Sequence, residues 1–212
     1  MAHINQKNQK RNRRYLILVY IGIFLFFSSA LYFTFNYCKN KKQDSENNKK
    51  IEEFFEVKDI EDETTTDTEQ VVEEEKVNIN YFAVLEIPKI NLKRGIYNVD
   101  SKENNVDKNI YILKNSTLPN KQDSHIILAA HSGNSYISYF KNLHRVNKND
   151  EVFFYFENTK YIYKVIDKYE VDKTGKIELE FTDSKDITLI TCIHGTEKQL
   201  VVVAKIVRQE NY

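Results

Sequence analysis

The stretch DITLITCIHGTEKQLVVVAKIV, residues 186–207, decides the fold of this chain. Its two near-continuous apolar runs, residues 186–191 and 199–207, predict strands buried on both faces, because a half-exposed strand alternates apolar with polar residues. The polar residues between the runs, with Gly195 among them, are typical of a turn. A thiol, Cys192, directly follows the first run. The stretch therefore predicts two core strands with a reactive side chain where the first one ends.

The residues before this stretch also read as short strands. Candidate strands lie at residues 81–87, 109–113, 124–130, 151–156 and 160–171. Pro88 ends the first of them, and residues 157–159 suggest a hairpin between the last two. One short helix is expected in residues 134–146, with Asn134 or Ser135 as its cap. Many short strands without strand–helix alternation predict a mainly β fold, a compact antiparallel or mixed barrel.

The N-terminal part of the sequence is different in kind. Residues 1–14 carry five positive charges and no acidic residue, and the next 23 residues, 15–37, carry no charge at all. An uncharged stretch of this length crosses the roughly 30 Å hydrocarbon layer as a helix, so a transmembrane helix is expected at residues 15–38. A cleavable signal peptide would have a shorter apolar core and small residues at its end. The basic tail predicts a cytoplasmic N-terminus and an extracellular location for the remainder.

A charged segment follows the apolar one. Residues 39–78 contain seven lysines and fourteen acidic residues, a composition that favours a flexible, solvated stalk, helical near residues 49–61. The domain at residues 79–212 then has 19 basic and 17 acidic side chains. That near-neutral balance gives no indication of a nucleic-acid-binding surface.

The predicted domain contains a single cysteine, Cys192, because Cys38 lies at the end of the apolar segment. An intramolecular disulfide framework is therefore excluded, and the thiol is either a small buried hydrophobe or a reactive group. His131 follows another apolar run in the same way, and Cys with His is a known nucleophile and base combination. The spacing of Cys and His ligands predicts no zinc site, and no calcium-binding loop is present, so no metal is expected.

Four stretches together give this sequence a family resemblance. Residues 188–192, TLITC, match the TLxTC signature of the sortases, membrane-anchored cysteine transpeptidases of Gram-positive bacteria. Residues 129–156 resemble the family's histidine segment, with its His, a Phe-x-x-Leu and an Asp before the next strand. IPKINLKRGIY at residues 87–97 resembles the family's first strand, and YKVIDKYEVDKTG at residues 163–175 its long sixth strand. The likeness covers residues 80–207.

The resemblance implies a fold and a reaction. The fold is a closed eight-stranded β-barrel with one or two short helices, preceded here by the transmembrane helix, and the activity needs no cofactor. Cys192 would attack a backbone carbonyl of an LPxTG-like C-terminal sorting signal in a surface-protein precursor and form an acyl-thioester. His131 would protonate the leaving amine and deprotonate the incoming amine of a peptidoglycan precursor or a pilin lysine. Thr191 would lie beside the oxyanion, and the enzyme would act from the cell membrane as a thiol-protease-like hydrolase or acyltransferase.

The sequence departs from the family at the third catalytic element. Sortases place an arginine just before the last apolar run, where this chain has Gln199, or Lys198 if the loop differs by one residue. A glutamine amide donates a neutral hydrogen bond, roughly half as strong as the charge-assisted fork of arginine. Arg145 and Arg94 are alternative sources of the contact, and tyrosines near His131 are candidates for the border of a peptide groove.

Two other functions therefore stay open beside transpeptidation. One is a catalytically weak, membrane-tethered module that binds the sorting signal without turning it over. The other is a cysteine peptidase that hydrolyses the same signal. The sequence also leaves the sortase subclass open.

Overall fold

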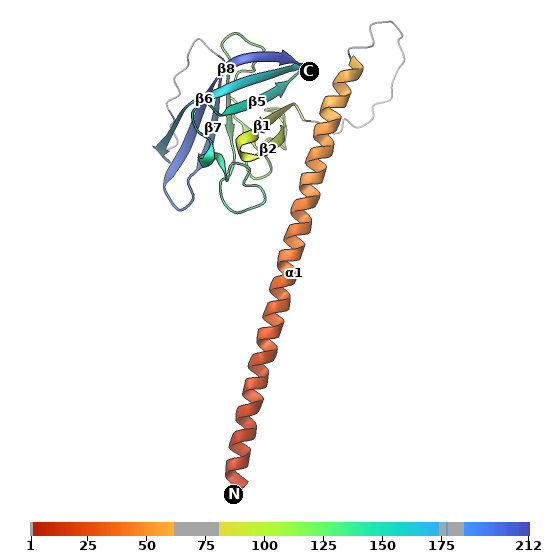
Figure 1. Cartoon of the computed structure of the whole chain (residues 1–212), viewed down its shortest axis with the longest axis vertical. Coiled ribbons are helices and arrows are strands. Elements are labelled where there is room, and N and C mark those ends of the chain that lie inside the picture. Colours follow the sequence, from red (N-terminus) through yellow and green to blue (C-terminus); the bar gives the residue numbers. More distant parts are fainter. Residues whose placement is uncertain (1, 62–80, 174–176, 178–184) are drawn as a thin grey trace. The chain divides into compact units, whose positions relative to one another are not determined.

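The computed structural model describes residues 2–61, 81–173, 177 and 185–212. The chain divides into two compact units, residues 1–46 and 47–212. Figure 1 labels the helix and most of the strands along the chain. The first unit holds the apolar segment, and the second holds the β domain.

The N-terminal helix α1 runs over Ala2–Glu61. Its large apolar side chains between Leu16 and Tyr37 are exposed, 47–71% of each being accessible. In the part of the chain that the structure describes, this is the one helix long and apolar enough to cross a membrane, with a mean hydropathy of 2.3. An apolar surface of this size is stable in lipid rather than in water, so the helix indicates membrane anchoring.

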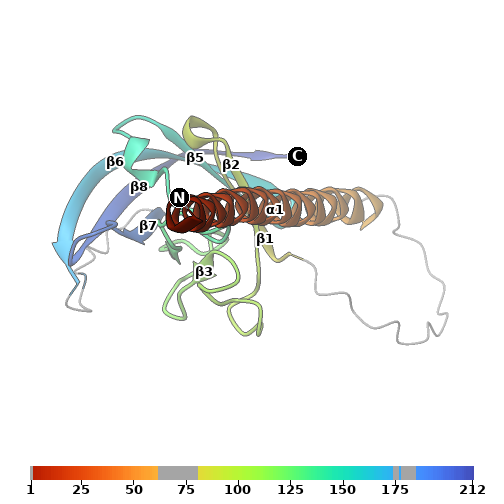
Figure 2. The same ribbon diagram turned by 90° about the horizontal axis from the view of Figure 1, so that it is seen from below.

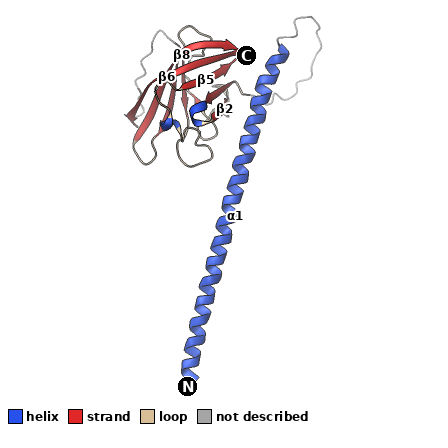
Figure 3. Ribbon diagram, viewed as in Figure 1, coloured by secondary structure: helices blue, strands red, loops and turns tan. Residues whose placement is uncertain are grey.

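The second unit contains eight strands, the number that the family resemblance implies; the residue pattern predicted seven of them and missed β2. They are β1 (Ala83–Ile87), β2 (Leu92–Ile96), β3 (Tyr111–Ile112), β4 (His125–Ala129), β5 (Glu151–Phe156), β6 (Thr159–Asp172), β7 (Asp186–Cys192) and β8 (Lys198–Asn211). One turn of 3₁₀ helix, Pro88–Ile90, separates β1 from β2, and another lies at Leu143–Arg145. Figure 3 shows how completely strands dominate this unit.

The strands form one sheet in the order β2-β1-β5-β6-β8-β7-β4-β3. β4 and β7 pair in parallel, and the other neighbours pair antiparallel. The long strands β6 and β8 curve along the wall, as the two views in Figures 1 and 2 show, and the sheet closes almost completely on itself. The predicted eight-stranded barrel is confirmed, nearly closed, with a seam between β2 and β3.

The barrel core fixes which residues point inward. Alternate residues in the central parts of β4, β7 and β8 and just after β4 belong to one cluster of buried side chains: Ile126, Leu128, Ala130, Ile187, Leu189, Leu200, Val202 and Ala204. Successive side chains of a strand point to opposite faces. The residues between these positions therefore lie on the outer face of the wall.

The predicted helix at residues 134–146 is present only as the 3₁₀ turn Leu143–Arg145. The rest of the segment forms turns, in which the Phe140 amide donates to the His131 carbonyl at 3.0 Å. Phe140 and Leu143 are fully buried. The Leu143 amide donates to the Phe140 carbonyl at 3.0 Å, so a tight turn brings these two side chains to the core without a longer helix.

The second unit also includes the end of α1, which the composition predicts to be a solvated stalk. Asn47, Ile51 and Phe54 are buried, and the last two share a second cluster of buried residues with Tyr81 and Val84 on the outer face of β1. Their spacing of four and three residues places them on one side of the helix. Residues 47–56 therefore belong structurally to the β domain; we call them the docked helix end.

Hydrogen bonds fix the docked helix end to β2. The Asn47 amide oxygen accepts from the Tyr81 hydroxyl at 3.0 Å and from the Gly95 amide at 3.3 Å, and its nitrogen donates to the Lys93 carbonyl at 3.3 Å. A Cβ at Gly95 would overlap the Tyr81 ring. Glycine is therefore needed here to let the aromatic ring lie against the strand. Burial raises the pKa of Tyr81 well above its ordinary value.

Candidate active site

The parallel pairing of β4 and β7 brings the two predicted reactive residues to the same rim. Ala129 is the register partner of Ile190, and the ladder continues with the Ala130 amide donating to the Ile190 carbonyl at 3.2 Å. Extended by two residues beyond the pair Ala129 and Ile190, this register sets His131 beside Cys192. Both residues lie at strand ends, where the core holds the backbone and the side chain meets solvent.

Two side chains tie these strand ends together. The Thr191 hydroxyl donates to the Ala130 carbonyl at 2.7 Å, and the Ser132 hydroxyl donates to the Cys192 carbonyl. Each bond runs from a neighbour of one reactive residue to the opposite strand. Thr191, which the resemblance places beside the oxyanion, is buried in the structure, with 5% of its surface exposed. Its hydroxyl binds the backbone directly before His131.

Alternation places the reactive side chains on the outer face. Thr191 shares the inward phase of Ile187 and Leu189, so Cys192 points outward. His131 follows the inward Ala130 and points outward as well. The Cys192 residue is partly accessible, and the His131 side chain is 39% exposed. A thiol and an imidazole thus share an open face of the wall, outside the hydrocarbon core.

The β7–β8 ladder separates the two candidates for the missing arginine. Cys192 pairs with Gln199, and the Ile193 amide donates to the Lys198 carbonyl at 2.9 Å. Hydrogen-bonded and non-hydrogen-bonded pairs alternate, so Cys192 and Gln199 form a non-hydrogen-bonded pair, whose side chains lie closest on one face. Lys198 points to the other face and pairs with Glu170 at 3.4 Å. Gln199 is the residue opposite the thiol.

The two arginines named from the sequence occupy other positions. Arg94 is 7% exposed, its Nε donates to the Asn109 side chain at 2.9 Å, and its guanidinium lies 4.3 Å from the centre of the Tyr139 ring. These contacts bridge the seam between β2 and β3. Arg145 is exposed in the 3₁₀ turn before β5.

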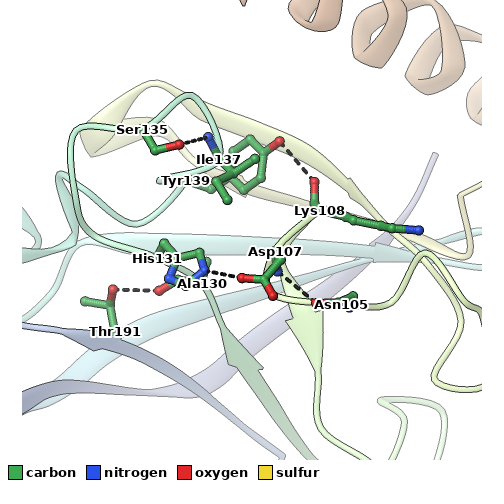
Figure 4. A network of polar contacts seen from close by, with 9 residues as sticks. All are labelled: Asn105, Asp107, Lys108, Ala130, His131, Ser135, Ile137, Tyr139 and Thr191. Atoms are coloured by element: carbon green, nitrogen blue, oxygen red, sulfur yellow. Dashed lines mark hydrogen bonds and ion pairs between the residues drawn. The ribbon is translucent and has the colours of Figure 1, made fainter.

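The sequence reasoning missed one partner of the histidine. Asp107 lies in the loop between β2 and β3, and its Oδ1 is 3.0 Å from His131 Nε2. Figure 4 shows the imidazole directed at this carboxylate, with Thr191 and Ala130 on its other side. The two residues are 24 positions apart and in different elements, so no local pattern in the sequence indicates the contact.

The comparisons with known proteins agree with this geometry. The family model of the sortase domain matches residues 85–207, more than half of the chain. The chain belongs to the sortase family. Sortases are cysteine transpeptidases that act on sorting signals, and the match includes His131, Cys192 and Gln199.

Solved sortase structures have the same fold. Listeria monocytogenes sortase A is 19% identical, with a TM-score of 0.53 over 62% of this chain and 90% of its own. Corynebacterium diphtheriae sortase A is 25% identical, with a TM-score of 0.55 over 63% of each chain. Clostridium perfringens sortase C with the C-terminal cell wall sorting motif is 25% identical, with a TM-score of 0.54 over 62% of this chain and 75% of its own. No curated protein sequence matches the chain.

The remaining histidines of this sortase have other environments. His194 is exposed in the turn after β7, and His144 is exposed with its Nδ1 3.1 Å from the Lys141 carbonyl. His125 is buried at the start of β4, with 5% of its surface exposed. Its Nε2 lies 2.8 Å from the Thr188 hydroxyl. Burial lowers the pKa of His125, and the nearby Asp186 carboxylate opposes that shift.

The surroundings of the sortase site include the predicted tyrosines. Tyr136 is 47% exposed in the segment after His131, and the Tyr139 hydroxyl donates to the Lys108 carbonyl at 3.4 Å. A separate cavity of about 190 Å³ lies near the seam and is lined by residues such as Phe82, Val99 and Leu118. It contains none of the site residues. Within the described residues, no group of three His, Cys, Asp or Glu side chains is arranged to hold a metal ion.

Proposed function

We propose that this sortase cleaves an LPxTG-like sorting signal and transfers the protein to an amine, with Cys192 as nucleophile. The Cys192 sulfur bonds to the scissile carbonyl carbon, the carbon–nitrogen bond breaks, and His131 gives a proton to the leaving amine. The product is an acyl-thioester on the enzyme. A thiolate is intrinsically nucleophilic, and an adjacent imidazole is the usual means of generating it.

The second half of the reaction returns the enzyme to its starting state. His131 takes a proton from the incoming amine of a peptidoglycan precursor or a pilin lysine, the amine nitrogen bonds to the acyl carbon, the carbon–sulfur bond breaks, and Cys192 leaves as the thiolate. The sulfur regains its proton from the imidazole. A histidine that acts as acid in one step and base in the next needs no cofactor.

Gln199 takes the role of the family arginine in this proposal. Its position across the ladder from Cys192 supports a hydrogen bond from the side-chain amide to the substrate carbonyl, where negative charge develops. Thr191 contributes by holding the backbone at the two strand ends. An amide is neutral, so the charge stabilisation is weaker than with arginine, and slow turnover is expected.

The same proposal includes the orientation of the protein in the membrane. Five basic residues precede the apolar segment, which favours a cytoplasmic N-terminus, a single span at residues 15–38 and an extracellular catalytic domain. That side of the cell membrane holds both surface-protein precursors and cell-wall amines. The C. perfringens sortase C structure with a sorting motif supports a substrate of this class.

One observation carries the proposal: the β4–β7 ladder and two hydrogen bonds, Thr191 to Ala130 and Ser132 to Cys192, hold together the strand ends next to His131 and Cys192, and Cys192 is partly accessible. A thiol in the core would be a structural residue and would react poorly. The rival proposal, a binding module without turnover, is favoured by the one departure from the family pattern, Gln199. Both proposals use the same face, so chemistry rather than binding must distinguish them.

The test uses the full chain in detergent, a sorting-signal peptide and an amine, with mass spectrometry of peptide and protein. We expect ligated product and an acyl adduct on Cys192, and neither with Cys192→Ala. The His131→Gln variant should lose at least 100-fold in rate, the lower range of a general acid–base contribution. Free acid without ligated product would establish a peptidase, and bound peptide without an adduct would establish a binding module.

A further inference from the structure

Among the residues that the structure describes, Asp107 is the only acidic residue paired with His131, and its backbone is held in an ordered turn. Its backbone amide donates to the Asn105 side chain at 2.9 Å, which forms a tight turn around it. The amides of Lys108 and Asn109 donate to the Asn105 carbonyl at 2.9 and 2.8 Å. The carboxylate therefore projects from an ordered turn, although its side chain is 75% exposed.

The turn is anchored to the barrel on its C-terminal side. Asn109 is 1% exposed, donates to the Gly95 carbonyl at 2.7 Å and accepts from Arg94. The Arg94 guanidinium lies over the Tyr139 ring, and the Tyr139 hydroxyl reaches the Lys108 carbonyl. This chain of contacts connects the β2–β3 seam to the segment after His131. Figure 4 shows its last contact, between Tyr139 and Lys108.

The basic side chain next to Asp107 in the sequence pairs with a different carboxylate. Lys108 follows Asp107 directly, but its Nζ lies 2.8 Å from Glu103 Oε1. Asp107 Oδ1 instead lies 3.0 Å from the His131 Nε2. Glu103 thus pairs with Lys108, and Asp107 pairs with the candidate catalytic base, His131.

The chemistry of this contact assigns the two ring nitrogens. An ionised carboxylate only accepts hydrogen bonds, so Nε2 must carry the proton that is shared with Asp107. In neutral imidazole the other nitrogen, Nδ1, is then the bare acceptor. We propose that Asp107 is a positioning residue, which holds His131 as the Nε2–H tautomer and leaves Nδ1 to exchange protons with the thiol and the amines.

This inference rests on the proposed transpeptidation for its kinetic consequence but not for its tautomer. A carboxylate that orients a histidine acts on the chemical step and not on peptide binding, so kcat should fall while KM stays constant. Because both side chains are substantially exposed, solvent screens the pair, and the expected loss is about 3–5-fold rather than the thousands seen for buried partners.

The experiment compares Asp107→Ala, Asp107→Asn and Glu103→Gln in the full chain in detergent. Asp107→Ala should lower kcat about 3–5-fold. Asp107→Asn keeps an oxygen that accepts from Nε2–H and should fall between it and the wild type. Glu103→Gln removes a carboxylate from the same loop that contacts Lys108 instead, and it should leave kcat unchanged.

A second measurement does not depend on turnover. In ¹⁵N-histidine-labelled Cys192→Ala protein, the His131 ring should show the Nε2–H tautomer, and adding Asp107→Ala should shift it toward a mixture. Assignment follows from His131→Gln. Equal kcat and an unchanged tautomer in Asp107→Ala would overturn the inference, as would an equal loss in Glu103→Gln. If the wild type makes no ligated product, the proposed function fails, and the tautomer alone decides the role of Asp107.

Discussion

Two outer faces of the same barrel differ in what the chain does with them. On β1 and β2, the docked helix end covers the wall, and Ile51 and Phe54 are only 5% and 6% exposed. At the ends of β4 and β7, the His131 side chain remains 39% exposed and Cys192 is partly accessible. Both faces are produced by the same alternation of side chains along a strand.

The difference teaches that the fold alone does not make a site. Outward aromatic and aliphatic residues on the first face, Tyr81, Val84 and Tyr155, form a second cluster that requires a cover. Outward residues on the second face end in a thiol, an imidazole and an amide, whose solvation makes exposure favourable. The covered face stabilises the domain, and the open face leaves room for a substrate.

The largest effect is expected for the stability of the domain when the docked helix end loses its contact with the barrel. Phe54→Ala deletes a buried aromatic side chain and should cost about 3–5 kcal/mol of domain stability, the usual range for Phe→Ala in a core. Thermal unfolding of the full chain in detergent would measure the loss. Glu52→Ala, at an exposed position of the same helix, is the matched control. A Phe54→Ala domain as stable as the control would mean that the helix end does not stabilise the barrel.

The next effect concerns the open face. Gln199→Ala should lower kcat/KM about 100-fold to 1000-fold, the typical cost of one oxyanion donor. Lys198→Ala should change it less than about twofold, because this side chain lies on the opposite face, in an exposed pair with Glu170. Rates of peptide ligation by mass spectrometry distinguish the two. The reverse pattern would show that the turn before β8 shifts by one residue in the working enzyme.

The open face could be predicted from the sequence further than the covered one. The apolar runs before His131 and Cys192 predicted strand ends, and TLITC named the family, because both signals are local. The choice between Gln199 and Lys198 depended on register, which the turn at residues 193–197 determines. A one-residue change in a hairpin loop reverses every side chain of the following strand, so only the ladder could separate the two candidates.

The composition of the sequence did not predict that the docked helix end covers the barrel. The many charges of residues 39–78 predicted a solvated stalk. The spacing of Asn47, Ile51 and Phe54, four and three residues, is a helical signal that could have identified the contact of this helix with the barrel. Asp107 had no such signal, because its partner His131 is brought near by the barrel seam. Contacts of this kind depend on tertiary structure and leave no period in the sequence.

A smaller effect on the covered face is expected at Gly95. Gly95→Ala places a methyl group where the Tyr81 ring lies, so the ring must move and its hydrogen bond to Asn47 weakens. Overpacking of this kind costs about 1–3 kcal/mol. Thermal unfolding should report the loss, and Gly133→Ala is the control, since a Cβ there meets only the Ser138 hydroxyl at 3.6 Å. Equal stability of both variants would contradict the close packing of Tyr81.

The smallest effect separates two histidines on one strand face. His125 and His131 share the outward phase of β4 and its continuation, but only His125 is buried, and burial lowers its pKa. The unfolded chain therefore binds a proton at this residue more readily than the folded domain does. The resulting stability is fully present above the ordinary histidine pKa of about 6.5 and is lost as the pH falls below it.

His125→Gln removes this contribution, so its melting temperature should fall less than that of the wild type between pH 7.5 and pH 5.5. Each kcal/mol corresponds to about 2–4 °C for a domain of this size. His144→Gln, at an exposed position, should follow the wild-type curve. If the two variants show the same acid sensitivity, the buried imidazole does not limit the stability of the domain in acid. The His125 side chain would then be accessible to water in solution.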